Sequence, residues 1–240
     1  APRCLSSQGL DVAGRAPSSR PMEQTRKIKL PKPAGDGRIA RLIDLVEGAL
    51  NPAPGAGRIA LALALGIVTH LAIAAAVLAM IAAMAFGMSE SLGRVPQPWA
   101  WVANAALVLQ FPLLHSLLLT RRGGKKLAVG RHGGTLATTT FALIASLQLL
   151  ALFALWTPSG VVWWRAEGPW LALTLTAYAA AWLLLMKASF DAGAEVQSGA
   201  LGWMSLMANR KPRFPDMPES GTFRVIRQPI YLSFALTTWT

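Results

Sequence analysis

The segment 221–231, with the sequence GTFRVIRQPIY, brings two arginines, a proline and a tyrosine together directly before an apolar run. Arg224 and Arg227 are three residues apart, so one helical turn would bring both guanidinium groups to a single anionic group. Pro229 suits the first turn of a helix, where a backbone N–H has no helical partner. The arginines also fit a simpler interpretation, in which they are the positive residues that flank a membrane span. The spacing therefore indicates a basic loop entering a membrane helix, with anion binding as its candidate chemistry.

His115 is a second residue whose position suggests chemistry, because it lies inside the apolar run 99–119. Asn104 and His115 are separated by about three helical turns and share one helix face. Pro112 is expected to bend the helix just before His115. A polar side chain in hydrocarbon is costly and usually faces the helix bundle. His115 is therefore predicted either to act as a catalytic base or to make a structural hydrogen bond.

Three charged residues follow one another at four-residue steps after the fourth apolar run: Lys187, Asp191 and Glu195. This spacing predicts an exposed helix face with salt bridges along it. A second interpretation, in which the same face borders an active-site cavity, stays open at this point.

The segment 221–231 resembles the Gly-x-Tyr-x-x-x-Arg-His-Pro-x-Tyr signature of the isoprenylcysteine carboxyl methyltransferase-like family of integral membrane methyltransferases. Phe223 replaces the first tyrosine of the signature and Gln228 replaces the histidine, while Gly221, Arg227, Pro229 and Tyr231 match. The stretches LLHSLLLTRRGGKK (113–126) and SFDAGAEVQ (189–197) are similar to blocks of the bacterial methanethiol S-methyltransferase branch. The likeness extends roughly over 107–239.

This resemblance implies S-adenosyl-L-methionine as the cofactor, bound at Gly221, Arg227, Gln228 and Tyr231. Arg227 would hold the cofactor carboxylate in a bidentate pair, and Tyr231 would contact the adenosyl or sulfonium part. The methyl acceptor would be a small thiol, or a lipid-associated thiol or carboxylate, at the cytoplasmic face of the membrane. Glutamine can hydrogen-bond but does not titrate near neutral pH, so Gln228 would orient the cofactor while His115 supplies the base.

The composition places the chain in a membrane, because its 240 residues are 53% hydrophobic and only 14% charged. The single cysteine permits no internal disulfide, and three widely spaced histidines predict no metal site. The net charge of +12 comes from Lys and Arg residues grouped beside apolar runs, a pattern typical of cytoplasmic loops rather than of nucleic-acid binding. Membrane lipids are therefore the expected surroundings, with no nucleic-acid partner and an oligomeric state left open.

The elements that must position these residues are apolar runs long enough to cross a bilayer. Spans are predicted at 59–88, 99–119, 136–156 and 170–186, and an incomplete fifth at 230–240. The fold class is thus an all-α membrane bundle over 58–240, preceded by a basic, mostly disordered tail over 1–57. Helical spacing of apolar residues within 37–50 favours a short helix on the membrane surface, with a loosely structured linker as the alternative.

The loops fix an expected orientation. Arg94 and Arg165 are the only Lys or Arg residues in the first and third loops between spans, whereas the tail and the second loop are strongly basic. Because positive loops stay in the cytoplasm, the N-terminus is predicted to be cytoplasmic. The resemblance to a bacterial branch implies a bacterial inner membrane. Tryptophans beside the first and third loops suit the opposite headgroup region.

The ends of the sequence lead to two further expectations. Met22 is a candidate start, and the apolar run that reaches Thr240 is about half the length needed to span, so the chain is expected to continue. The resemblance implies that an acidic segment, similar to Glu-Glu-x-x-Leu, follows and completes the cofactor pocket.

Two other functions compete with membrane methyl transfer. One is a noncatalytic membrane protein of the same fold, of the denitrification-associated type, which the replacement at Gln228 favours. The other is an NADPH-dependent enzyme of the sterol-reductase type, in which Arg224 and Arg227 would bind a 2′-phosphate.

Overall fold

The computed structural model of the protein describes residues 37–89, 91–128, 130–162 and 164–240. Most of the predicted tail, 1–36, and the candidate start at Met22 lie outside these residues. The elements in chain order are α1 (Gly37–Leu50), α2 (Ala56–Ala85), α3 (Trp99–Leu119), α4 (Arg121–Leu127), α5 (Gly133–Leu155), α6 (Pro169–Asp191), α7 (Ala194–Gln197), α8 (Ala200–Met207), the 3-10 turn η1 (Gly221–Arg224) and α9 (Pro229–Trp239). The described residues form helices and no strands, which confirms the predicted all-α fold.

Four of these helices, α2, α3, α5 and α6, are long and apolar enough to cross a membrane. Their bounds agree with the predicted spans to within about five residues. Many large apolar side chains point outward, among them Leu71, Leu78, Leu183 and Met186, each 66% exposed. An apolar surface of this kind suits lipid rather than water, and the chain is therefore built as an integral membrane protein.

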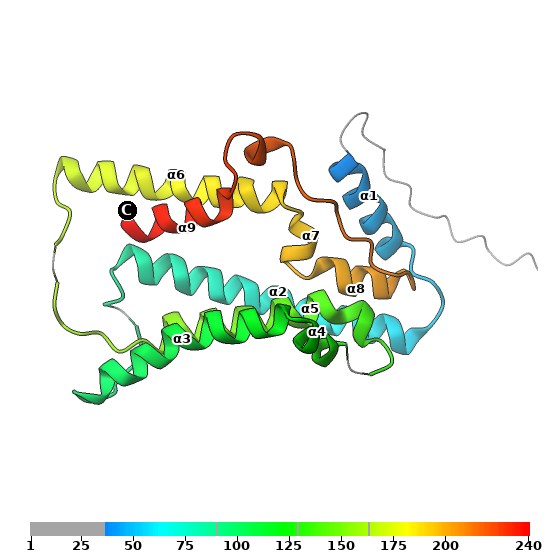
Figure 1. Cartoon of the computed structure of the whole chain (residues 1–240), viewed down its shortest axis with the longest axis horizontal. Helices are drawn as coiled ribbons and strands as arrows, with labels where there is room; N and C mark the ends of the chain where they lie inside the picture. The colour runs from blue at the N-terminus through cyan, green and yellow to red at the C-terminus, as the bar shows by residue number, and fades with distance from the viewer. Residues whose placement is uncertain (1–36, 90, 129, 163) are drawn as a thin grey trace, which may run out of the picture.

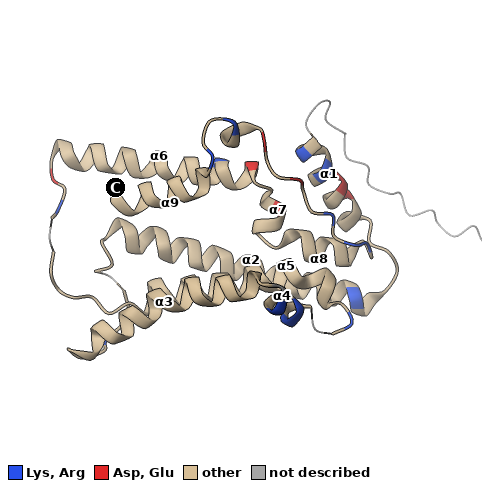
Figure 2. Cartoon of the chain, viewed as in Figure 1, with Lys and Arg blue, Asp and Glu red and all other residues tan. Residues whose placement is uncertain are grey.

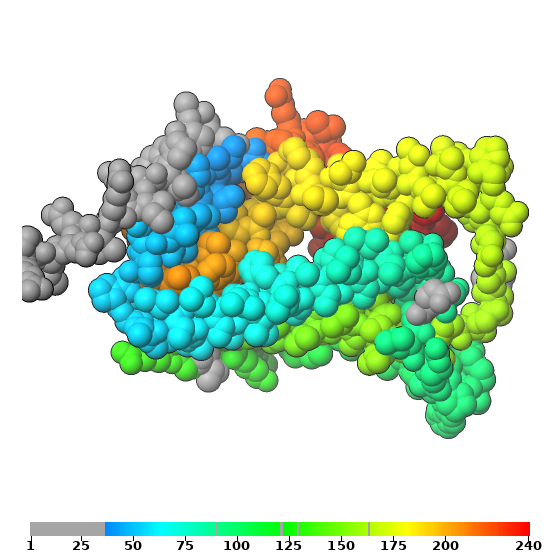
Figure 3. Space-filling model, turned by 180° about the vertical axis from the view of Figure 1, so that it is seen from behind, coloured from blue at the N-terminus to red at the C-terminus, as the bar shows by residue number. Residues whose placement is uncertain are grey.

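The long helices form two groups (Figure 1). In the first group α5 packs along α2, and also contacts α3 and the short helix α8. In the second group α9 packs against α6. The groups are joined where the hydroxyl of Tyr178 on α6 donates to the carbonyl of Ile81 on α2, at 2.9 Å. Seen from behind, the surface is hollowed between α2 and α6, and α9 is visible in this hollow (Figure 3).

Small residues and paired polar groups hold the first group together. Ala62, Ala76 and Ala83 of α2 are buried, which lets the helix backbones approach closely. Gln110 of α3 and Gln148 of α5 donate to each other's backbone carbonyls, at 3.1 and 3.0 Å. Asn104 bonds both the carbonyl and the N–H of Thr157. Such pairs satisfy polar groups that would otherwise lie unpaired in hydrocarbon.

Short helices close one end of the bundle. Helix α1 covers the segment where apolar spacing favours a helix, and it packs on α8. The Arg58 guanidinium at the start of α2 donates to the carbonyls of Leu206 and Met207 at the end of α8. The hydroxyl of Thr139 in α5 donates to the carbonyl of Gly199, at 2.7 Å. These contacts fix α1 and α8 over the ends of α2 and α5.

Most of the described Lys and Arg residues lie at this closed end, around α1, α4 and the segment that leads to η1 (Figure 2). Exposed tryptophans such as Trp99, Trp101 and Trp170 lie in or beside the loops of the other end. The charged end is expected to face the cytoplasm, because positive loops are retained there and tryptophans favour headgroup regions.

Reporter fusions check this orientation. Alkaline phosphatase, which is active only outside the cytoplasm, is expected to be active when fused after Leu92 or Gly160. The matched fusion after Lys126, in the basic α4, should be inactive. Activity in the opposite pattern would overturn the orientation.

Candidate functional site

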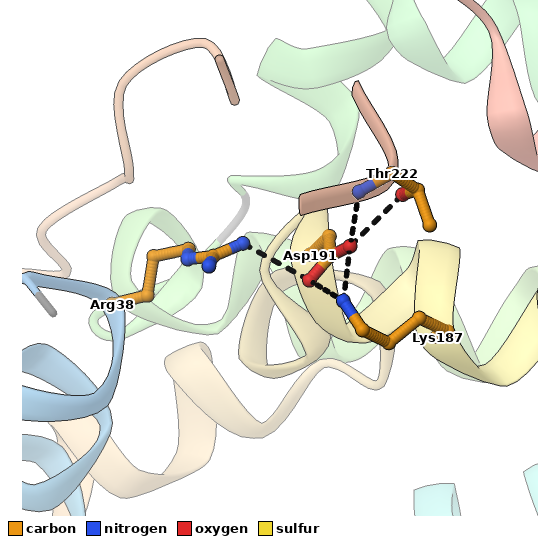
Figure 4. Close-up of polar contacts among 4 residues, drawn as sticks. All are labelled: Arg38, Lys187, Asp191 and Thr222. Atoms are coloured by element: carbon orange, nitrogen blue, oxygen red, sulfur yellow. Dashed lines mark hydrogen bonds and ion pairs between the residues drawn. The ribbon is translucent and has the colours of Figure 1, made fainter. Parts of the chain in front are cut away.

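Asp191, the last residue of α6, is the best-connected charged residue near the segment 221–231. Its side chain is only 1% exposed. The N–H and hydroxyl of Thr222 donate to Oδ2, at 2.7 and 2.9 Å, and Lys187 Nζ lies 2.6 Å from both carboxylate oxygens. Arg38 of α1 donates to Oδ1 at 3.0 Å. One carboxylate thus joins α6, α1 and η1 (Figure 4).

Gly221 lies directly against this carboxylate. Its φ of +67° is a backbone conformation that L side chains rarely adopt, and an added Cβ would overlap the Asp191 carboxylate. Both facts require glycine at this position. The structure therefore gives Gly221 a steric role next to Asp191, while its contact with a cofactor stays a prediction.

The segment carries its two arginines on the surface, Arg224 at the end of η1 and Arg227 between η1 and α9. Backbone N–H groups of Val225 and Ile226 donate to the carbonyl of Thr222 and close the turn. Pro229 is buried at the first turn of α9, and the Ser233 hydroxyl donates to its carbonyl at 2.7 Å. The segment is thus held at Thr222 and again at Pro229.

The predicted binding side chains of this segment point outward. Arg224, Arg227, Gln228 and Tyr231 are exposed, and Tyr231 retains 71% of its accessible surface. None of these four side chains has a hydrogen bond or an ion pair within the described part of the chain. The two guanidinium groups therefore keep all their donors available to an anionic ligand.

His115 lies elsewhere in the bundle. It is half-buried between the rings of Phe111 and Phe141, with centroid distances of 5.2 and 4.8 Å. Its Nδ1 is buried and has no hydrogen-bond partner among the described residues. Helix α3 packs on α4 and α5, whereas η1 and α9 pack on α6. The structure brings Gly221, Arg227, Gln228 and Tyr231 together on one segment but does not bring His115 to them.

The prediction of an exposed salt-bridged face at Lys187, Asp191 and Glu195 is wrong. Asp191 and Glu195 are 1% and 5% exposed, and only the pair between Lys187 and Asp191 lies within one helix. Gly193, with a φ of +96°, turns the chain after α6, so Glu195 lies in a different helix, α7. Arg41 of α1 donates to Glu195 at 3.1 Å.

Sequence reasoning missed Arg38 and Thr222 as partners of Asp191. Arg38 is separated from Asp191 by 153 residues, a contact that local spacing cannot reveal. The sequence does contain one indication of these ion pairs. Arg38 and Arg41 lie one helical turn apart, and the chain has few acidic residues with which they could pair.

Comparison with known proteins shows a distant similarity to a curated protein. The chain is 29% identical over 141 residues to methanethiol S-methyltransferase 1 of Bradyrhizobium diazoefficiens, a match that covers 58% of this chain and 49% of that protein. The chain thus matches about half the length of this relative. This protein is therefore a distant relative, over part of its length, of a thiol methyltransferase. No family model matches the chain, and no solved structure matches it.

Substituting Gly221 tests the close approach of η1 to Asp191. Gly221→Ala is expected to destabilise the protein by roughly 1–3 kcal/mol, because it combines a strained φ with overlap against a buried carboxylate. Gly134→Ala is the matched control, since an added Cβ there meets nothing within 4 Å and α5 is helical at that point. Thermal unfolding in detergent measures both. Equal melting temperatures for the two variants would contradict the geometry.

Proposed function

We propose that the protein transfers a methyl group from S-adenosyl-L-methionine to a small thiol, or to a lipid-associated thiol or carboxylate, at the cytoplasmic membrane face. One observation carries this proposal: a segment anchored at Thr222 and Pro229 presents Arg224 and Arg227 beside the apolar helix α9, and neither arginine has an acidic partner among the described residues. The distant similarity to a thiol methyltransferase supports the same reaction class.

The side chains of the segment suit the parts of this cofactor. Arg227 offers a planar pair of donors to a carboxylate, and Gln228 offers both a donor and an acceptor. Tyr231 follows Arg227 by four residues, and its exposed ring can attract a sulfonium cation. The sulfonium supplies an activated methyl group, so the protein's task is mainly to position the two reactants.

The acceptor would approach from the membrane side. The hollow between α2 and α6 reaches α9 from the lipid-facing surface, and a lipid-like acceptor partitions into that region (Figure 3). In this proposal His115 acts as the base for the acceptor thiol. Its Nδ1, which no described residue hydrogen-bonds, would accept the proton. This role requires α3 and α9 to approach each other during the reaction.

The same two arginines favour one alternative. Two guanidinium groups that have no acidic partner in the described part of the chain also suit the 2′-phosphate of NADPH, as in an enzyme of the sterol-reductase type. A protein that binds neither cofactor would be the noncatalytic member of the fold that Gln228 suggests.

Titration of the purified protein in nanodiscs with S-adenosylmethionine and with NADPH distinguishes these functions. We expect saturable binding of S-adenosylmethionine only, weakened roughly 10–100-fold in Arg227→Ala by the loss of a charge-assisted pair. His115→Ala is the comparison variant, expected to keep cofactor affinity and to lower methyl transfer to a thiol acceptor. Unchanged affinity in Arg227→Ala would overturn the assignment of the cofactor site.

A further inference from the structure

We propose that Asp191 is a positioning residue that holds the segment 221–231 in its ligand-binding conformation, and that α1 belongs to the same clamp. The proposal rests on the proposed function in taking this segment as the cofactor site. The clamp comprises Asp191, Lys187, Thr222 and Arg38, which come from three separate elements (Figure 4).

The first step in the argument is the burial of a charge. A carboxylate that is 1% exposed needs donors at fixed positions, because water does not reach it. Thr222 supplies two of these donors, from its N–H and its hydroxyl. The ionised side chain of Asp191 therefore has all its hydrogen-bond donors only while η1 is in place. The cost of leaving a buried carboxylate without these donors stabilises η1 at this position.

The second step leads from η1 to the arginines. The Thr222 carbonyl accepts the N–H groups of Val225 and Ile226, so the turn that carries Arg224 starts at the clamped residue. Pro229, buried at the start of α9, holds the other end. Only a few residues separate these two fixed points, so the directions of Arg224 and Arg227 depend on the bonds at Thr222.

The third step concerns α1. Arg38 reaches Asp191, and Arg41 reaches Glu195 just beyond the turn at Gly193, so two ion pairs join α1 to the end of α6 and to α7. Arg38 and Arg41 are 23% and 27% exposed, which makes these pairs more sensitive to salt than the buried bonds from Thr222. Displacement of α1 would leave Asp191 with less positive charge around it. Docking of α1 is thereby coupled to the conformation of the segment 221–231.

The experiment measures trypsin cleavage after Arg224 and Arg227 in the protein in nanodiscs, with the peptides followed by mass spectrometry. Cleavage of a closed segment tracks the fraction of time it is open. Asp191→Asn is expected to speed cleavage at these sites roughly tenfold and Arg38→Gln about threefold, with S-adenosylmethionine affinity weakened in the same order. Asp44→Asn is the control, because it also removes a carboxylate from the charged end, on α1. Asp44 is 60% exposed, and its ion pair with Arg210 is long, at 3.7 Å. This variant should change neither quantity.

A second variant keeps the proposal testable if Asp191→Asn does not fold. Thr222→Val removes one donor and leaves every charge, and it should speed cleavage about threefold. Cleavage at the unmodified rate in folded Asp191→Asn, or in Thr222→Val, would overturn the clamp. Faster cleavage with unchanged S-adenosylmethionine affinity would overturn the positioning role. Failure of the proposed function looks different: the unmodified protein then binds no S-adenosylmethionine, while the cleavage rates still confirm or overturn the clamp.

Discussion

A buried carboxylate at the end of a membrane helix is costly unless fixed donors surround it, and the charged end of this protein is arranged around one. Asp191 receives donors from α6, α1 and η1. Gly221 has to be glycine because of the same carboxylate. The start of the segment 221–231 therefore depends on this charged group, and so does part of the docking of α1. Removing the carboxylate would leave Lys187 and Arg38 without their shared partner.

The apolar part of the bundle follows a different constraint. The hydrophobic effect does not drive helices together inside hydrocarbon. Close packing at small residues and the reciprocal hydrogen bonds between Gln110 and Gln148 instead join α2, α3 and α5. Helices α6 and α9 form a separate pair. Tyr178 of α6 joins this pair to α2, and Trp182 of α6 packs against the buried cluster of Met80, Ala83 and Phe153. This division leaves the hollow between α2 and α6, and the segment 221–231 lies between the end of α6 and the start of α9. The proposed reaction, between a soluble cofactor and a lipid-like acceptor, would use this segment if it lies at the cytoplasmic membrane face, as the positive charge of this end predicts.

The sequence predicts the spans well because membrane helices are local features. An uncharged run of sufficient length identifies each, and Pro229 marks the start of α9 correctly. Spacing failed at Asp191 and Glu195, since the four-residue rule assumes one continuous helix and Gly193 ends it. The docking of Arg38 and Arg41, and the distance of His115 from the segment 221–231, depend on packing between parts of the chain that are far apart in sequence. Periodicity can show that Arg38 and Arg41 share one helix face, but it does not identify the distant residues that they contact.

Amide hydrogen exchange of the segment 221–227 tests the central claim most directly, because the Thr222 N–H is bonded to a carboxylate that is shielded from water. In the unmodified protein at neutral pH, the account predicts that this amide exchanges at least about a hundredfold more slowly than in an unstructured peptide. Raising the salt concentration should speed its exchange by weakening the ion pairs of α1. Exchange at the rate of a free peptide would contradict the account.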